Sequence, residues 1–140
     1  MTIQEKEQEI IDEFAIYDDW MDKYAYIIEL GKDLPLIEAQ YKTNDRLIKG
    51  CQSQVWLHAD LKDGKMYYTA DSDAIITKGV IALLIRVVNG ESPANVALSE
   101  FNFIKEIGLQ EHLSPTRANG LVSMVKDMKL AALKAMKNED

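Results

Sequence analysis

The chain has 140 residues, of which 47% are hydrophobic and 28% are charged, values typical of a soluble protein with one core. Its formal net charge is −7, and residues 1–40 hold eleven acidic but only three basic side chains. This acidity argues against a nucleic-acid partner, because binding phosphates requires a basic surface. A single cysteine excludes an internal disulfide.

The sequence shows no sign of a targeting or membrane segment. The first residues, "MTIQEKEQEI", are acidic and lack the basic start and apolar stretch of a signal peptide. The longest apolar run, from Val80 to Val88, is interrupted by Arg86 and is too short to cross a bilayer. No repeat or linker divides the chain. We therefore expect one domain over residues 1–140, a cytoplasmic location and no membrane partner.

Two helices are predicted near the N-terminus. Apolar residues recur at helical spacing over residues 3–14 and again, after a break, over residues 20–28. Asp18 is the expected N-cap of the second helix, and Gly31 marks its end. The following segment, "LPLIEAQYKTNDR", is expected to be a loop, with or without a helical turn.

A β-hairpin is predicted next. Residues 55–61 alternate between apolar and polar side chains, which is typical of a strand with one buried face. Asp63-Gly64 favours a tight turn, and "KMYYTAD" is the expected partner strand. A short third strand is expected over residues 46–49.

The second half of the chain is predicted to be helical. Residues 74–88 are apolar nearly all round, so we expect a buried helix there, capped by Asp71-Ser72-Asp73. Short helices are expected from Pro93 and over residues 101–107, and Ser114-Pro115 is the expected start of a long final helix. The core stripe of that helix is predicted to be Leu121, Met124, Val125, Met128 and Met136. These elements indicate an α+β fold, in which a small antiparallel β-sheet is packed against helices.

Cys51, the one cysteine, is either a small buried side chain or a nucleophile. Three polar residues follow it, and Lys42, Arg46 and Lys49 precede it. Positive charge near a thiol lowers its pKa, so these three residues predict a reactive sulfur.

No catalytic machinery accompanies that thiol in the sequence. The two histidines, His58 and His112, are more readily explained as structural than as a base, and together with Cys51 they match no metal-ligand spacing. No phosphate-binding loop is present either. These observations favour a carrier whose thiol is used without a built-in enzyme.

Two charged residues have a structural and a functional interpretation, and both interpretations stay open. Arg117 falls in the first turn of the final helix, where the helix dipole disfavours a cation. It either pairs with an acid such as Glu111 or faces an anion or a partner's carboxylate. Asp73 either caps the buried helix or lies beside the cysteine loop. For Gly79 and Gly120, glycines inside helices, we expect close backbone packing.

Three motifs, "KGCQSQVW", "DSDAIITKGVIALL" and "HLSPTRANGL", resemble those of the SufE family of sulfur-acceptor proteins, and the resemblance extends over nearly the whole chain. The one departure is Thr116, where the family usually has serine. The resemblance implies a SufE/IscU-like α+β fold. It also implies that Cys51 accepts sulfur, and that Asp73 and Arg117 act around the cysteine loop and at the partner interface. The residues that would form the presenting loop are Gly50, Gln52, Ser53 and Gln54.

The resemblance further implies the partners. A SufS-type cysteine desulfurase would pass persulfide sulfur to Cys51 and be stimulated, and a SufB-containing scaffold for iron–sulfur cluster assembly would receive the sulfur. Pyridoxal phosphate would belong to the desulfurase, so we expect neither cofactor nor metal on this chain. The alternative is a non-covalent activator of a desulfurase, as for a CsdE-like paralogue, with Cys51 structural. A homodimer is left open.

A persulfide must be shielded between its donor and its acceptor. We therefore expect Cys51 to be partly buried in the free protein and to move out on docking, with Gly50 as the hinge. An apolar surface formed by Val55, Leu57 or the helix over residues 74–88 is expected to provide the shielding.

Overall fold

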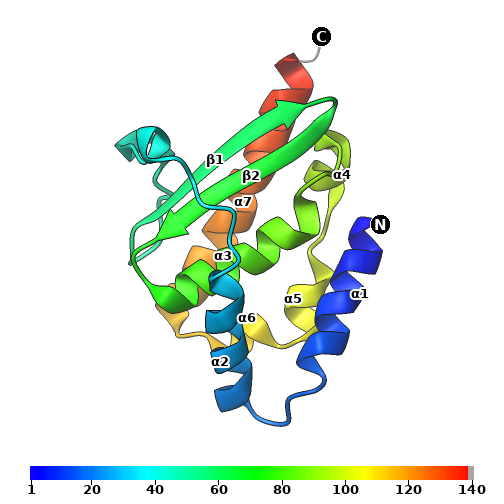
Figure 1. The fold of residues 1–140 in the computed structure, drawn as a ribbon, viewed down its shortest axis with the longest axis vertical. Coiled ribbons are helices and arrows are strands. Elements are labelled where there is room, and N and C mark those ends of the chain that lie inside the picture. Colours follow the sequence, from blue (N-terminus) through cyan, green and yellow to red (C-terminus); the bar gives the residue numbers. More distant parts are fainter. Residues whose placement is uncertain (139–140) are drawn as a thin grey trace.

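A β-hairpin and a set of helices form the protein (Figure 1), and the computed structural model describes residues 1–138. The strands are β1 (Val55–Lys62) and β2 (Lys65–Ser72), which pair antiparallel along their whole length. The turn between them has φ of 52° at Asp63 and 75° at Gly64, the left-handed conformation that such a tight turn requires. The predicted hairpin and the α+β class are confirmed.

The helices lie behind the hairpin and below it in the view of Figure 1, and α3 lies in the middle of the molecule. It contacts β2 on one side and α1 and α2 on another, and it also packs against α7, which passes behind the hairpin. The α-helices are α1 (Ile3–Phe14), α2 (Trp20–Gly31), α3 (Ile75–Val88), α4 (Pro93–Leu98), α5 (Asn102–Glu106), α6 (Leu109–His112) and α7 (Pro115–Asn138). Two short 3-10 turns, η1 (Ala39–Tyr41) and η2 (Asn44–Arg46), connect α2 to the hairpin.

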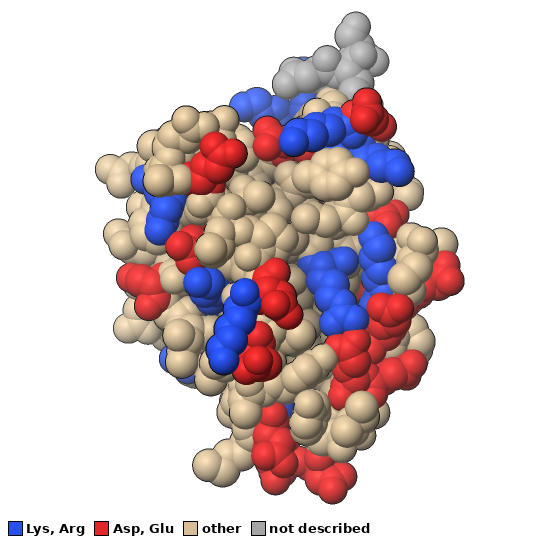
Figure 2. Space-filling model, viewed as in Figure 1, with Lys and Arg blue, Asp and Glu red and all other residues tan. Residues whose placement is uncertain are grey.

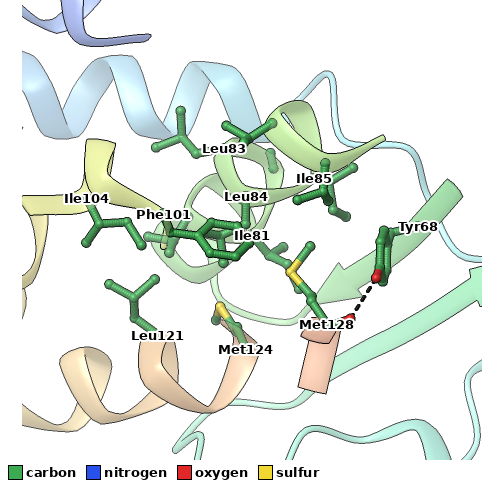
Figure 3. Close-up of a cluster of buried hydrophobic side chains, with 14 of the residues drawn as sticks. Tyr68, Ile81, Leu83, Leu84, Ile85, Phe101, Ile104, Leu121, Met124 and Met128 are labelled. Carbon is green, nitrogen blue, oxygen red and sulfur yellow. Dashed lines mark hydrogen bonds between the residues drawn. The ribbon is translucent and has the colours of Figure 1, made fainter. Parts of the chain in front are cut away.

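The hydrophobic core is built around α3, as its apolar sequence predicts. Only Ile75, Ile76, Lys78 and Arg86 of this helix are not buried. Figure 3 shows the α3 side chains meeting those of α5 and α7 in one cluster. The hydroxyl of Tyr68 on β2 donates to the carbonyl of Met128 at 2.7 Å, which joins the hairpin to α7 (Figure 3).

Close contact between α2 and α3 depends on Gly79. A Cβ at this position would lie 2.1 Å from the carbonyl oxygen of Ile27, far inside van der Waals contact. The prediction of close backbone packing is therefore confirmed here, and the contact fixes the position of α3, whose first turns line the site described below.

Four local predictions are wrong. Asp19 caps α2 in place of Asp18, because its side chain accepts from Asp22 N at 2.9 Å. The third strand over residues 46–49 is not formed, since the chain makes only an isolated bridge there. Asp71 and Ser72 belong to β2, and no side chain caps α3. Met136 is 38% exposed because α7 extends past the core, whose last α7 residue is Ala132.

The charges are unevenly spread over the surface. Acidic side chains gather over α1 and the connection to α2, on the right and at the lower end of the face in Figure 2. Over the described residues, none of the helices is both long enough and apolar enough to span a bilayer.

Candidate functional site

The loop of residues 50–54 carries Cys51 and enters β1. Gly50 begins it with φ of +94°, in the left-handed region that favours glycine. A Cβ at Gly50 would also lie 2.6 Å from the hydroxyl oxygen of Ser123 on α7. Conformation and space therefore both require glycine immediately before the cysteine.

Hydrogen bonds hold this loop against the start of α3. The backbone N–H of Gln54 donates to Asp73 Oδ1 at 3.0 Å, and the N–H of Asp73 donates to the Gln54 carbonyl at 3.3 Å. The hydroxyl of Ser53 donates to Thr77 Oγ1 at 3.3 Å. Asp73 thus lies beside the cysteine loop and is not a cap of α3, whereas the side chains of Gln52 and Gln54 are exposed.

The sulfur of Cys51 rests on α7 and is half-buried, as expected. Its S–H donates to the carbonyl of Gly120 at 3.7 Å. A Cβ at Gly120 would lie 3.1 Å from the sulfur, so this glycine makes room for the thiol. The close packing expected at Gly120 is confirmed, and the group that packs there is Cys51 itself.

A cavity of about 150 Å³ opens next to the sulfur, between the loop, α3 and α7. Its apolar lining comes from Ile76, Val80, Leu113 and Met124, and its polar lining includes Thr77, Thr116 and Arg117. Of the apolar surfaces considered from the sequence, the helix over residues 74–88 is the one that lies beside the sulfur.

The prediction is wrong for two strand residues. Val55 is fully buried in the core, and Leu57 lines a separate depression. Leu113 and Met124 were not predicted for this site, although Met124 was expected in the core stripe of the final helix. Leu113 lies between α6 and α7 and Met124 lies on α7, and both reach the cysteine loop only in the folded chain.

Arg117 lies at the rim of the cavity, in the first turn of α7, and is exposed. Its backbone N–H donates to Ser114 Oγ at 3.4 Å, which confirms Ser114 as the cap. Within residues 1–138 its guanidinium makes no ion pair, and the pairing with Glu111 is therefore not formed. The charge remains available to an anion beside Cys51.

The expected activation of the thiol by nearby lysines and arginine is wrong. Burial raises the pKa of Cys51, and the negative charge of Asp127 on α7 raises it further. Lys42 binds Asp71 at 2.9 Å, and Arg46 donates to His58 Nδ1 at 3.1 Å, so both cations are engaged elsewhere. Neighbours in sequence are not the neighbours of this sulfur in space.

Neither histidine lines the cavity. His58 stacks on Tyr41 with ring centroids 3.9 Å apart, and His112 stacks on Trp20 at 4.0 Å. Both are structural, as the sequence favours. Among the described residues, no group of three His, Cys, Asp or Glu side chains could hold a metal ion.

Comparison with known proteins agrees with this geometry. The model of the SufE family, described as an Fe-S metabolism associated domain, matches residues 8–132. The chain belongs to the SufE family. Members of this family are sulfur carriers or activators and not classical enzymes.

Several proteins named SufE-like are similar to this chain in sequence. A SufE-like protein of Rhizobium meliloti is 40% identical over 89% of this chain and 92% of its own length. One from Synechocystis is 38% identical, covering 89% of this chain and 78% of the relative. SufE-like protein 1 of Arabidopsis thaliana is 37% identical over 91% of this chain and 35% of its own length. That relative is named chloroplastic/mitochondrial, so a cytoplasmic location for this chain stays a prediction.

A solved structure has the same fold. The solution structure of a hypothetical protein from Thermus thermophilus superposes with a TM-score of 0.79, at 22% identity, and covers 94% of this chain and 96% of that one. The SufE-like α+β fold is thereby confirmed.

Proposed function

We propose that this SufE-family protein accepts a sulfur atom on Cys51 from the persulfide of a SufS-type cysteine desulfurase and stimulates that enzyme. The observation that carries the proposal is the placement of one thiol on a hydrogen-bonded loop, at the mouth of a small and largely apolar cavity. Proteins of this family work with cysteine desulfurases, which supports the choice of donor.

The transfer is a displacement at sulfur. The Cys51 thiolate attacks the terminal sulfur of the donor persulfide, a new S–S bond forms on Cys51, and the donor S–S bond breaks. The donor cysteine leaves as a thiolate and takes up a proton. One disulfide-type bond replaces another, so no external oxidant or reductant is needed.

The cavity suits the product of this step. An S–S bond is about 2.05 Å long, so the added sulfur extends only one atom beyond Sγ, and a cavity of about 150 Å³ beside Sγ has room for it. The apolar residues of the lining would shelter one side of the terminal sulfur, and the exposed guanidinium of Arg117 at the rim provides a positive charge for its anion. Because the chain has no second cysteine, no other thiol of the same molecule attacks the persulfide.

The contact with α7 leaves only part of the Cys51 sulfur exposed to a docked donor. We therefore infer that the loop moves outward on docking, about Gly50, whose left-handed conformation gives the backbone its freedom there. The sulfur would then pass to a SufB-containing scaffold.

The test is a mass measurement. The protein is incubated with the desulfurase, pyridoxal phosphate and cysteine, and is then weighed intact without reductant. We expect a gain of one sulfur atom in the wild type and none in Cys51→Ser. No gain in the wild type, under conditions in which the desulfurase turns over, would refute the carrier function.

One observation favours a second candidate function. The raised pKa and the partial burial of Cys51 describe a resting thiol of low reactivity, as expected for a packing residue. In that case the protein would activate the desulfurase without covalent transfer. Full stimulation of desulfurase turnover by Cys51→Ser would support this activator over the carrier.

A further inference from the structure

One edge of the β-hairpin is open, and a depression with apolar walls lies beside it. We propose that an extended segment of a partner protein docks there, adding a strand to β1 at Ala59 and Leu61 and placing a lysine or arginine against Asp127 of α7. This surface shares no lining residue with the cavity next to Cys51. The inference therefore goes beyond the proposed function and does not depend on it.

The outer edge of β2 is covered by the chain itself. Every second residue of this strand turns its backbone away from β1 and is bonded by another segment. The N–H groups donate over 2.8 to 3.0 Å to the following acceptors: Met66 to the Glu91 carbonyl, Tyr68 to Asn89 Oδ1 and Ala70 to the Pro35 carbonyl. Because backbone groups alternate in direction along a strand, Tyr67 and Thr69 bond instead to their partners on β1, Asp60 and His58.

The outer edge of β1 is covered only at its start. The same alternation turns the backbone of Leu57, Ala59 and Leu61 away from β2. A bridge between Leu47 and Trp56 occupies the beginning of this edge. Within residues 1–138, no hydrogen bond reaches the N–H or C=O of Ala59 or Leu61. Unpaired backbone groups on a strand edge are a template for a further strand, and only a chain in extended conformation complements them.

A depression of about 200 Å³ gives such a strand an apolar surface to rest on. It lies between the open edge and α7, which passes behind the hairpin (Figure 1), and Leu57, Ala59, Leu130 and Ala131 line it. Leu130 is 51% exposed in the free protein. Residues directly opposite each other in a sheet point to the same face, so every second side chain of the added strand would cover this surface.

The charges of the depression favour a basic segment. Its charged lining residues are Asp45, Arg46 and Asp127. Arg46 is already engaged, because its Nε donates to His58 Nδ1 at 3.1 Å and its guanidinium lies over the ring of Tyr41. Asp127 is half-buried and makes no ion pair with any residue up to position 138. A lysine or arginine of the segment would pair with Asp127, whereas an acidic residue would be repelled.

A second copy of this chain fits the open edge less well than a short segment does. Two β1 strands that pair antiparallel over Leu57–Leu61 would place Lys62 of one copy opposite Trp56 of the other. Leu47 already occupies that position on the edge through its bridge to Trp56. The two copies would therefore collide there, whereas a segment that ends before Leu47 meets no such obstacle.

Amide hydrogen exchange of the full chain tests strand addition directly. In the free protein we expect the amides of Ala59 and Leu61 to exchange fast and those of His58 and Asp60 slowly, because only the second pair bonds to β2. The probe is an acetylated and amidated peptide in which a lysine is followed by alternating valine and threonine, at about 1 mM to detect weak binding. We expect it to slow exchange at Ala59 and Leu61 about five-fold and to leave His58 and Asp60 unchanged.

Matched variants test the apolar surface and the charge. Leu130→Gln should weaken binding of the peptide about five-fold. Leu133→Gln, on the same helix but outside the depression and 50% exposed, should bind like the wild type. Asp127→Asn should weaken binding of the lysine peptide about three-fold and should not weaken that of a peptide with glutamate in place of lysine. Circular dichroism shows whether each variant is folded.

Three results would overturn the inference. The first is unchanged exchange at Ala59 and Leu61 when the lysine peptide is present. The second is equal weakening in Leu130→Gln and Leu133→Gln. The third is protection of these two amides in the free chain that disappears on dilution, because a second copy would then occupy the edge. None of these measurements involves Cys51, so a failure here is distinct from a failure of the sulfur-transfer assay.

Discussion

The hydrogen bond between Asp73 and Gln54 should control how often the cysteine loop leaves α7. Asp73→Ala removes the acceptor of the Gln54 N–H, which lies 3.0 Å from Oδ1. A hydrogen bond to a charged group contributes about 1.5–3 kcal/mol, and less where water competes. Both residues are exposed, so we assign this hydrogen bond a contribution of about 1 kcal/mol. Its loss corresponds to about a five-fold rise in the population of the released loop.

The assay is alkylation of Cys51 at a fixed pH, with opening of the loop as a fast step before the reaction. We expect the rate of Asp73→Ala to rise about five-fold over the wild type. Asp73→Asn is the matched variant, because it keeps an oxygen acceptor at this position and removes only the charge. Its rate should rise less than that of Asp73→Ala, because the amide oxygen still accepts the Gln54 N–H, although more weakly than a carboxylate does.

Two results would refute this reasoning. An unchanged rate in Asp73→Ala would mean that the hydrogen bond does not hold the loop. Equal rises in Asp73→Ala and Asp73→Asn would mean that the charge of Asp73 acts, and not its acceptor oxygen. The urea unfolding midpoint of each variant shows whether the change is confined to the loop, because global destabilisation would lower it.

Three further predictions concern the packing that supports the site. Gly79→Ala should lower the free energy of unfolding by about 1–3 kcal/mol, because the methyl group would overlap the Ile27 carbonyl; wild-type stability in urea would contradict this. Tyr68→Phe removes a buried donor to α7 and should lower the Tm by about 4 °C in calorimetry, so an unchanged Tm would show that the bond contributes nothing. The hydrogen bond from Arg86 lowers the pKa of Glu13, so its stabilisation is present above the unfolded pKa of about 4.3 and is lost as the pH falls through the folded value. The difference in unfolding free energy between the wild type and Glu13→Gln should therefore shrink from about pH 6 to about pH 3, and a constant difference would exclude this contribution.

Local signals in the sequence were sufficient for most of the fold. Asp63-Gly64 has the conformational preference of a tight turn, and the apolar residues of α3 leave no polar face for solvent. The failures have a common cause in tertiary structure. Residues 46–49 form a single bridge, between Leu47 and Trp56 of β1, before the chain turns at Gly50, and Met136 lies on the apolar stripe of α7 beyond the end of the core.

The site was predictable in its residues and less so in its chemistry. Cys51, Asp73 and Arg117 are conspicuous in the sequence, and the structure brings all three to one loop and one cavity. Burial against α7 raises the pKa of the thiol, and the contact with Gly120 comes from a helix far along the chain. Only the packing of α7 against the cysteine loop makes Gly120 a neighbour of the sulfur.

The loop movement that we infer on docking would explain the wrong prediction about the thiol. With the loop on α7, burial and Asp127 raise the pKa of Cys51, and nearby cations do not compensate. Away from α7 the sulfur loses both influences, and the exposed side chain of Lys49 moves with it. We therefore expect sulfur transfer from a docked desulfurase to Cys51 to reach half of its maximal rate at a lower pH than alkylation of the free chain. Coincident pH profiles would mean that docking leaves the thiol in its resting environment, and the loop movement would then be unnecessary.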